Sequence, residues 1–245
     1  MINTLVFEKN KSSYETLACI QASCLFDHKI EIVYLSYDDI SRCDFLERDG
    51  VLPVGDVPFM KGCFQHSGRK IPENMSYPPC FMKYLKRDIG ILRKQHLKHF
   101  LDKMFIKPEK TKLFTGFVYD PDGNYDEHDQ EQFDVFSHLP DSTLIYISDV
   151  VDIEQEFRFY IQDNKIIGYA RYDDKESDDR SDFSMIEEML KDSTINHPYT
   201  IDLGFSSSGD PLLIECNDAW AIGYYNGSMS RLQYMNFLHE RWKMM

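Results

Sequence analysis

The 245-residue sequence lacks the features of membrane proteins and of proteins that coat nucleic acids. No apolar run reaches the roughly 18 residues of a membrane span. Positive charge is scarce, because 27 Lys and Arg residues stand against 41 Asp and Glu residues and leave a net charge of −14. A chain that binds nucleic acid by charge has the opposite balance. We therefore expect neither a membrane nor a nucleic acid among its partners.

Several other signals are missing as well. The six cysteines include no C-x-x-C pair and no zinc spacing, which favours a reduced chain over a disulfide scaffold. The opening MINTLVFEKN has acid and amide residues where a secretory signal has an apolar core. We therefore expect a cytoplasmic protein, in the host cytoplasm if the source is viral. No G-x-x-x-x-G-K-[ST], H-E-x-x-H or G-x-S-x-G motif occurs, which argues against P-loop, zincin and serine-hydrolase sites.

The composition is that of a folded globular protein, with 42% hydrophobic and 14% aromatic residues. The length suits one large or two small domains. The apolar pattern of residues 1–75 predicts a small α/β domain. Its expected strands are 2–7 and 29–35, with a helix over 12–26 between them. The helix has Ser12 or Ser13 as its N-cap.

The segment VLPVGDVPFM (51–60) reads as a loop followed by a new segment. Three prolines between Ile71 and Pro79 indicate the connection to a second domain, residues 76–245. That domain is rich in predicted strands, with helices expected at the end of 81–100, over 182–191 and over 228–242. The predicted strands include MFIKP, LFTGFVY, TLIYIS, EFRFYI and KIIGYARY.

The stretch DLGFSSSGDPLLIECND predicts a hairpin with polar side chains on one face. Ser208-Gly209 is a two-residue turn signal between two β-prone runs. Counting outward from that turn gives three cross-strand pairs, Ser207–Asp210, Phe205–Leu212 and Asp202–Glu215. Because side chains alternate along a strand, Asn217 shares the face of Glu215. Asp202, Glu215 and Asn217 then converge and suit Mg²⁺ or Mn²⁺, although a solvated polar face is the alternative.

Two further groups of basic residues could meet phosphate. Lys107, Lys110 and Lys112 crowd the stretch FIKPEKTK, which could fold over phosphates or form a solvated turn. A second hairpin, turning at Asp163-Asn164, gives the cross-strand pairs Glu156–Arg171 and Arg158–Tyr169. Either Glu156 pairs with Arg171 and leaves Arg158 free for an anion, or both arginines belong to a structural ion-pair ladder.

These pieces occur in a recognisable order, and that order resembles the ATP-grasp fold. The match is most similar to a small ATP-grasp clade that is named for one arginine and two lysines and is frequent in phage and bacterial genomes. The resembling stretches cover most of the chain from residue 51 on. They are VLPVGDVPF, FIKPEKTKLFTG, YISDVVDIEQEFRFYI, IIGYARY and DLGFSSSGDPLLIECND.

The resemblance implies a mixed α/β fold with a small N-terminal α/β domain and a nucleotide held between two antiparallel-sheet subdomains. It also implies ATP and Mg²⁺ (or Mn²⁺), and an ADP-forming carboxylate–amine ligase that works through an acyl phosphate. Its substrates would be small molecules, amino acids, peptides or a protein terminus. Two alternatives stay open: an ATP-dependent phosphotransferase, and a nucleotide-binding or viral interaction protein without ligase activity.

The resemblance also assigns roles to individual residues. Lys107 would contact the α and β phosphates, and Lys112 or Lys110 would come from the loop that closes on the nucleotide. Arg158 would face the γ-phosphate or the acyl phosphate, with help from Arg171. The remaining assignments are Ser148, Asp149, Val150, Val151 and Glu156 for the nucleotide, and Asp202, Glu215 and Asn217 for the metal. After Asn217 the chain reads DAWAIGYY, without the Asn-x-x-Pro-Gly run of several amino-acid ligases, so the acceptor side is not defined.

Overall fold

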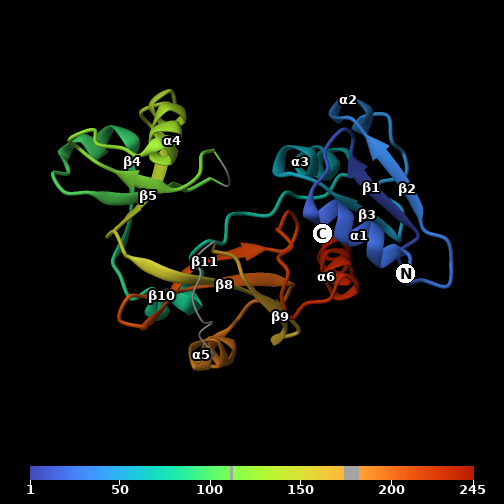
Figure 1. Ribbon diagram of the computed structural model, residues 1–245. Coiled ribbons are helices and arrows are strands. Elements are labelled where there is room, and N and C mark those ends of the chain that lie inside the picture. Colours follow the sequence, from blue (N-terminus) through green and yellow to red (C-terminus); the bar gives the residue numbers. More distant parts are fainter. Residues whose placement is uncertain (111–112, 174–181) are drawn as a thin grey trace.

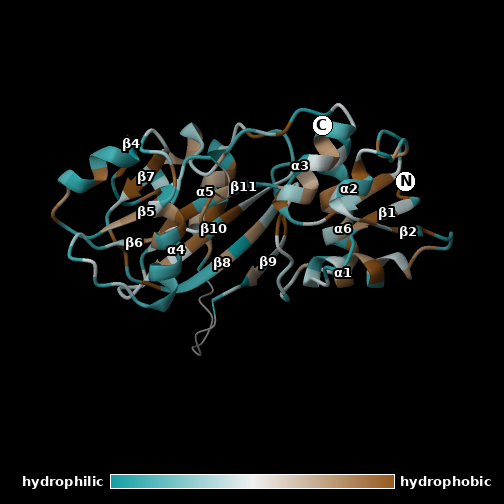
Figure 2. Cartoon of the chain, turned by 90° about the horizontal axis from the view of Figure 1, so that it is seen from above, coloured by the Kyte–Doolittle hydropathy of each residue, from teal (hydrophilic) through white to brown (hydrophobic). Residues whose placement is uncertain are grey.

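The computed structural model describes residues 1–110, 113–173 and 182–245, and it contains three β-sheets (Figure 1). Seen from above, the three lobes built on these sheets lie in a row (Figure 2). The middle lobe holds the four-stranded central sheet, in the order β11-β10-β8-β9. No helix in these described ranges is both long enough and apolar enough to cross a membrane.

The N-terminal lobe is a parallel sheet flanked by helices. Its strands, in the order β2-β1-β3, are β1 (Thr4–Glu8), β2 (Glu31–Leu35) and β3 (Val51–Val54). Its helices are α1 (Tyr14–Ser23), α2 (Tyr37–Ile40) and α3 (Val57–His66). The Ser13 side chain caps α1 by accepting from the Thr16 N–H, which confirms one of the two expected caps.

One element of this lobe differs from the sequence prediction. VLPV, which was expected to be a loop, is the buried edge strand β3 and pairs in parallel with β1. A proline is tolerated in an edge strand, because only one side of that strand takes part in the sheet hydrogen bonds. Pro53, opposite Val6, therefore does not prevent pairing.

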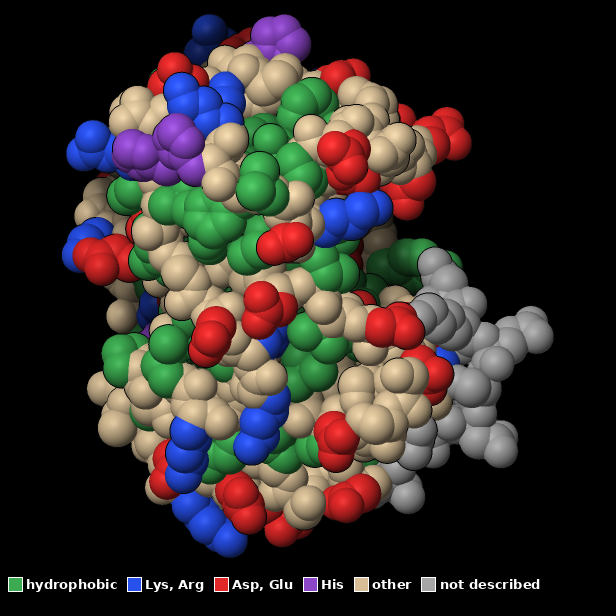
Figure 3. All heavy atoms as spheres, turned by 90° about the vertical axis from the view of Figure 1, so that its left-hand side faces the viewer, with side chains coloured by type: hydrophobic (Ala, Val, Ile, Leu, Met, Phe, Trp, Pro, Cys, Tyr) green, Lys and Arg blue, Asp and Glu red, His purple; other side chains and the backbone are tan. Residues whose placement is uncertain are grey.

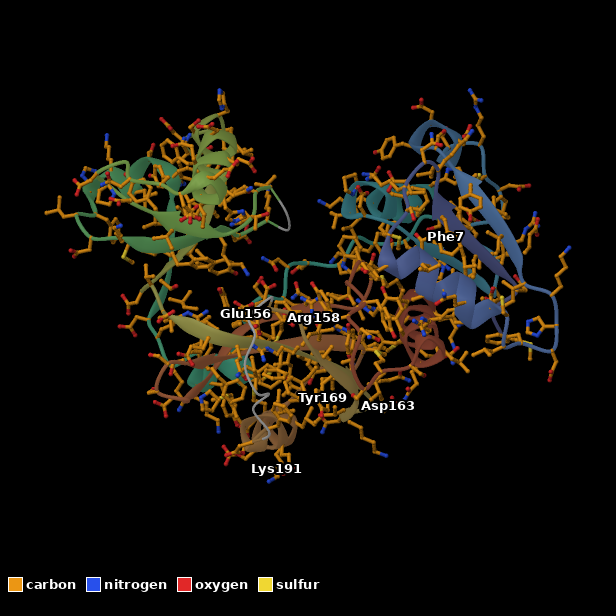
Figure 4. The ribbon with its side chains drawn as sticks, viewed as in Figure 1. Phe7, Glu156, Arg158, Asp163, Tyr169 and Lys191 are labelled. Atoms are coloured by element: carbon orange, nitrogen blue, oxygen red, sulfur yellow. The ribbon has the colours of Figure 1, made fainter. Side chains whose placement is uncertain are left out.

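The central sheet is antiparallel and has two different faces. Its strands are β8 (Ile153–Gln162), β9 (Lys165–Arg171), β10 (Tyr199–Ser206) and β11 (Pro211–Asp218). One face packs with α5 (Ser184–Asp192) and the 3-10 turn η1 (Pro79–Tyr84) around a buried cluster that includes Phe157 and Leu203. The other face, which carries Glu156 and Arg158, points toward the N-terminal lobe and the lobe of the third sheet (Figure 4).

The third sheet, called here the outer sheet, faces the central sheet from the other end of the row. It has the order β4-β7-β5-β6 and packs against α4 (Glu127–Ser137). Its strands are β4 (Ile89–Arg93), β5 (Met104–Pro108), β6 (Phe117–Tyr119) and β7 (Leu144–Ser148). In Figure 3, acidic side chains are spread over both the lobe of the outer sheet and the lobe of the central sheet, as the net charge of −14 leads one to expect.

The expected helix at the end of segment 81–100 is confirmed only over Lys94–His99, as a 3-10 helix, and its first residues form a strand instead. Residues Ile89–Arg93 form β4, and the 3-10 turn η2 (Lys94–His99) follows. Pairing with β7 overrides the local helical pattern, because it lets Leu92 pack on the cluster around Ile106 and Phe117.

The last helix, α6 (Arg231–Lys243), returns to the N-terminal lobe. Its Tyr234 and Phe237 belong to the same buried cluster as Leu5 and Phe59. The two chain ends therefore lie in one lobe (Figure 1). The predicted boundary at 75/76 falls in the segment 67–78, which contains no helix or strand, and the division itself stays a prediction.

Candidate active site

A cavity of about 930 Å³ lies between the outer sheet and the central sheet. This volume is in the range of cavities that hold small ligands. The polar side chains that line it include Arg87, Lys107, Gln132, Glu156, Glu215 and Asn217, together with the linker residues Asn74 and Ser76. The apolar ones include Phe105, Phe114, Val118, Val135, Ile153 and Ile214. The cavity therefore has a charged part and an apolar part.

The hairpin of β10 and β11 contributes Glu215 and Asn217 to the charged part, and its register differs from the prediction near the turn. Phe205 pairs with Pro211 instead of Leu212, so the first expected pairs are wrong. A β-bulge next to Asp202 then adds one residue on β11 and restores the expected pairing of Asp202 with Glu215.

The same bulge puts two successive side chains into the cavity. Leu213 and Cys216 both belong to the buried cluster on the far face of the sheet. Ile214 and Glu215, which lie between them, both line the cavity. Strand β11 therefore places an apolar side chain, Ile214, directly beside the Glu215 carboxylate in the cavity.

Asn217 joins the two carboxylates, as expected. Its Nδ2 donates to Glu215 Oε1 at 2.9 Å and to Asp202 Oδ2 at 3.3 Å. Lys107, on β5, bridges from the outer sheet to the other Glu215 oxygen and donates to Ser76 Oγ at 3.2 Å. Burial disfavours the charged forms, but the Lys107–Glu215 pair outweighs it, raising the pKa of Lys107 and lowering the pKa of Glu215.

Arg158 forms a buried ion pair with Asp202, and its expected contact with a phosphate stays a prediction. Its Nε and Nη2 donate to the two Asp202 oxygens at 2.8 and 2.7 Å, and both side chains are buried. Tyr172 and Tyr225 stack on each other, with ring centroids 5.1 Å apart, and both rings lie beside the guanidinium. Burial raises the pKa of Asp202, and the charge of Arg158 opposes that rise.

The second hairpin turns where it was predicted, but its register shifts. Asp163 and Asn164 both have positive φ, as the predicted turn requires. A bulge next to Tyr160 then places Arg158 opposite Ala170 and Arg171 opposite Phe157. The pairs expected by counting are therefore wrong, and Tyr169 lies on the other face of the sheet from Arg158 (Figure 4). Arg158 pairs with Asp202 and Arg171 pairs with Asp173, so the reading that places both arginines in structural ion pairs fits best.

The other predicted nucleotide-binding residues divide into two groups. Ser148, the last residue of β7, and the following residues 149–151 line the cavity, as does Glu156. Lys110 is exposed and is not among the described residues that line the cavity. Lys112 lies outside the described residues.

The predicted metal ligands fit a divalent ion in part. Glu215 and Asn217 reach the cavity with oxygen-bearing side chains, which suit Mg²⁺. Asp202 does not line the cavity in the described part of the chain, and Arg158 occupies both of its oxygens. Residues 1–110, 113–173 and 182–245 contain no group of three or more His, Cys, Asp or Glu side chains that could hold a metal ion.

Sequence reasoning missed several residues of this site. Arg87, in the segment before β4, donates to the carbonyls of Leu213 at 2.6 Å and Ile214 at 3.2 Å on the central sheet. Tyr77 covers the Lys107 ammonium, which lies 5.1 Å from the ring centroid. Both belong to segments that carry no recognisable motif, and only the fold brings them to the cavity.

The three sheets and the cavity between two of them define an ATP-grasp protein. Within that class, residues 84–236 match a family model for an ATP-grasp domain, family 2 of the clade named for one arginine and two lysines. The match spans more than half of the chain, so the chain belongs to this family. No curated protein matches the sequence.

Solved structures of the same fold include several ligases. D-cycloserine synthetase DcsG has a TM-score of 0.56 at 12% identity, over 98% of this chain and 99% of that one. D-alanine–D-alanine ligase from Bacillus anthracis, complexed with ATP, has a TM-score of 0.53 at 14% identity, over 98% and 97%. The ATP-grasp ligase PsnB, complexed with a phosphomimetic variant of a minimal precursor, Mg and ADP, has a TM-score of 0.51 at 10% identity, over 99% and 98%. At these identities the likeness shows the fold, which confirms the predicted fold class.

Proposed function

We propose that the chain binds Mg-ATP between the outer and central sheets and uses it to join a carboxylate to an amine. One observation carries the proposal: Lys107, Glu215 and Asn217 converge in the cavity that Ser148 to Val151 also line. A cation, a carboxylate and an amide oxygen meet the needs of a triphosphate and its metal ion. The named ligases of the same fold support the choice of reaction.

The apolar part of the cavity suits the adenine ring. Ile214 and Ile153 line the cavity on the side of the central sheet. Phe105 and Val118 line it on the side of the outer sheet. The backbone of the strand-free segment at Asp149 and Val150 offers donors and acceptors for the edge of the base. We therefore place adenine beside this segment and the phosphates toward Lys107.

The charged part suits the phosphates. Lys107 has three N–H donors, and Glu215 and Ser76 take two of them, so the third can reach a phosphate oxygen. Glu215 and the Asn217 amide oxygen would hold Mg²⁺, which would neutralise charge on the transferring phosphoryl group. Asp202 would act indirectly, because it binds Arg158 and accepts a hydrogen bond from the Asn217 amide.

The reaction then takes two steps. A substrate carboxylate oxygen attacks the γ-phosphorus of ATP, the bond to the bridging oxygen breaks, and ADP leaves. The amine attacks the carbonyl carbon of the acyl phosphate, and phosphate leaves as the amide forms. The walls of the cavity would exclude the water that hydrolyses an acyl phosphate. The substrates would be amino acids, peptides, other small molecules or a protein terminus, and a PsnB complex with a precursor peptide supports the inclusion of peptides.

Product analysis by mass spectrometry tests the proposal. The protein is incubated with Mg-ATP and a pool of amino acids, short peptides and cell extract, with Glu215→Gln alongside. A ligase gives ADP only with the pool, and a new mass equal to two components minus water. A phosphorylated product would instead identify a phosphotransferase, and no turnover with no nucleotide binding would leave an interaction protein.

A further inference from the structure

The segment 67–78, which links the N-terminal lobe to the rest of the chain, touches both sheets of the nucleotide cavity. Ser76 is buried in this linker, and its carbonyl accepts from the Cys216 N–H at 2.9 Å. Cys216 lies between Glu215 and Asn217, so this bond holds the linker beside the two residues of β11 that reach the cavity. The linker therefore forms part of the charged wall.

The hydrogen bonds around Ser76 have a fixed direction. Asn74 Oδ1 accepts from the Ser76 N–H at 3.1 Å and from its hydroxyl at 2.9 Å. The hydroxyl proton is thereby used, and the lone pairs of Ser76 Oγ are left for Lys107 Nζ at 3.2 Å. An ammonium can only donate, so each bond in the chain from Lys107 through Ser76 to Asn74 is made with the required polarity.

Asn74 also holds the other sheet. Its Nδ2 donates to the carbonyl of Glu109, the residue that directly follows β5. One side chain thus fixes the hydroxyl that receives Lys107 and the backbone at which the lysine-rich stretch begins. Both contacts lie at the end of the cavity that we assign to the phosphates.

We propose that Asn74 and Ser76 are positioning residues of the nucleotide site. They hold the Lys107 ammonium between Glu215 and the open cavity, with one N–H directed at the phosphates. Without them, Glu215 is the remaining hydrogen-bond partner of the ammonium in the described part of the chain and draws it toward the carboxylate. This inference rests on the proposed function, because it presumes that the phosphates of a nucleotide bind beside Lys107.

The test is the affinity for Mg²⁺ with a non-hydrolysable ATP analogue, measured by titration calorimetry. Ser76→Ala and Asn74→Ala should each weaken binding by roughly tenfold, the size of one hydrogen bond to a charged group. In a Lys107→Met background, Ser76→Ala should have no further effect, because it acts only through the ammonium. Ser67→Ala is the matched control, since that linker hydroxyl donates to the carbonyls of Cys63 and Phe64 at the end of α3, and it should leave binding unchanged.

Three outcomes would overturn the inference. The first is unchanged affinity in both single variants. The second is an equal loss from Ser76→Ala with and without Lys107, because a purely structural linker would weaken both backgrounds alike. If Ser76→Ala fails to fold, Ser76→Cys in the two backgrounds carries the same test, because a thiol is a weak hydrogen-bond acceptor. The third is absence of binding by the wild-type protein, which removes the proposed function as well, whereas wild-type binding with unaffected variants removes this inference alone.

Discussion

The buried pair of Arg158 and Asp202 gives a sharp prediction about stability. In Asp202→Asn the guanidinium keeps its charge and its burial but loses its counter-charge. Removing one partner of a buried ion pair costs about 3–5 kcal/mol, and the retained amide oxygen of Asn favours the lower end. With roughly 2–4 °C lost per kcal/mol in a chain of this size, we expect the melting temperature to fall by about 6–12 °C.

Glu215→Gln is the matched isosteric control for that change. Its side chain is 25% exposed, and its partner Lys107 can turn toward the open cavity when the pair is lost. We therefore expect this variant to lose about 1 kcal/mol or less and to melt within roughly 3 °C of the wild type. Thermal unfolding followed by circular dichroism at neutral pH compares the two. If Asp202→Asn melts as close to the wild type as Glu215→Gln does, the ion pair is not the structural element described above.

Three further predictions concern the cavity, the pair and a buried histidine. Gly204→Ala should weaken nucleotide binding several-fold in a titration, because the new Cβ would lie 3.0 Å from Ile153 and 3.2 Å from Ile214 and push both into the cavity. Replacing Arg158 and Asp202 together, by Met and Leu, should restore most of the lost melting temperature, since no unpaired charge stays buried. Burial lowers the pKa of His239 to about 4, so the unfolded chain takes up this proton near pH 6.5 and the folded chain does not. The free energy of unfolding should therefore fall as the pH drops from about 6.5 to about 4, and urea titrations at several pH values should show a smaller fall in His239→Leu.

Features that depend on a few neighbouring residues could be predicted from the sequence. The turn at Asp163-Asn164 follows from residues that accept positive φ, and the cap of α1 follows from a serine hydroxyl. The meeting of Glu215 and Asn217 follows from alternation along one strand. The order of the motifs then led to the right fold family.

Features that depend on non-local pairing could not be predicted. Neither β-bulge has a local signal, and each shifts the register by one residue. Arg158 meets Asp202 because β8 lies beside β10, and counting within a hairpin cannot give the order of strands that belong to different hairpins. The strands β3 and β4 form for the same reason, since sheet pairing decides their structure.

The central claim is that the cavity between the outer and central sheets binds Mg-ATP through Lys107 and Glu215. Calorimetric titration with Mg²⁺ and a non-hydrolysable ATP analogue tests it most directly, in the wild type and in Lys107→Met, Glu215→Gln and Lys110→Met. We expect Mg²⁺-dependent binding to the wild type, a loss of affinity of at least roughly tenfold in the first two variants, and little change in Lys110→Met, whose side chain is exposed. Wild-type affinity in both Lys107→Met and Glu215→Gln would contradict the account.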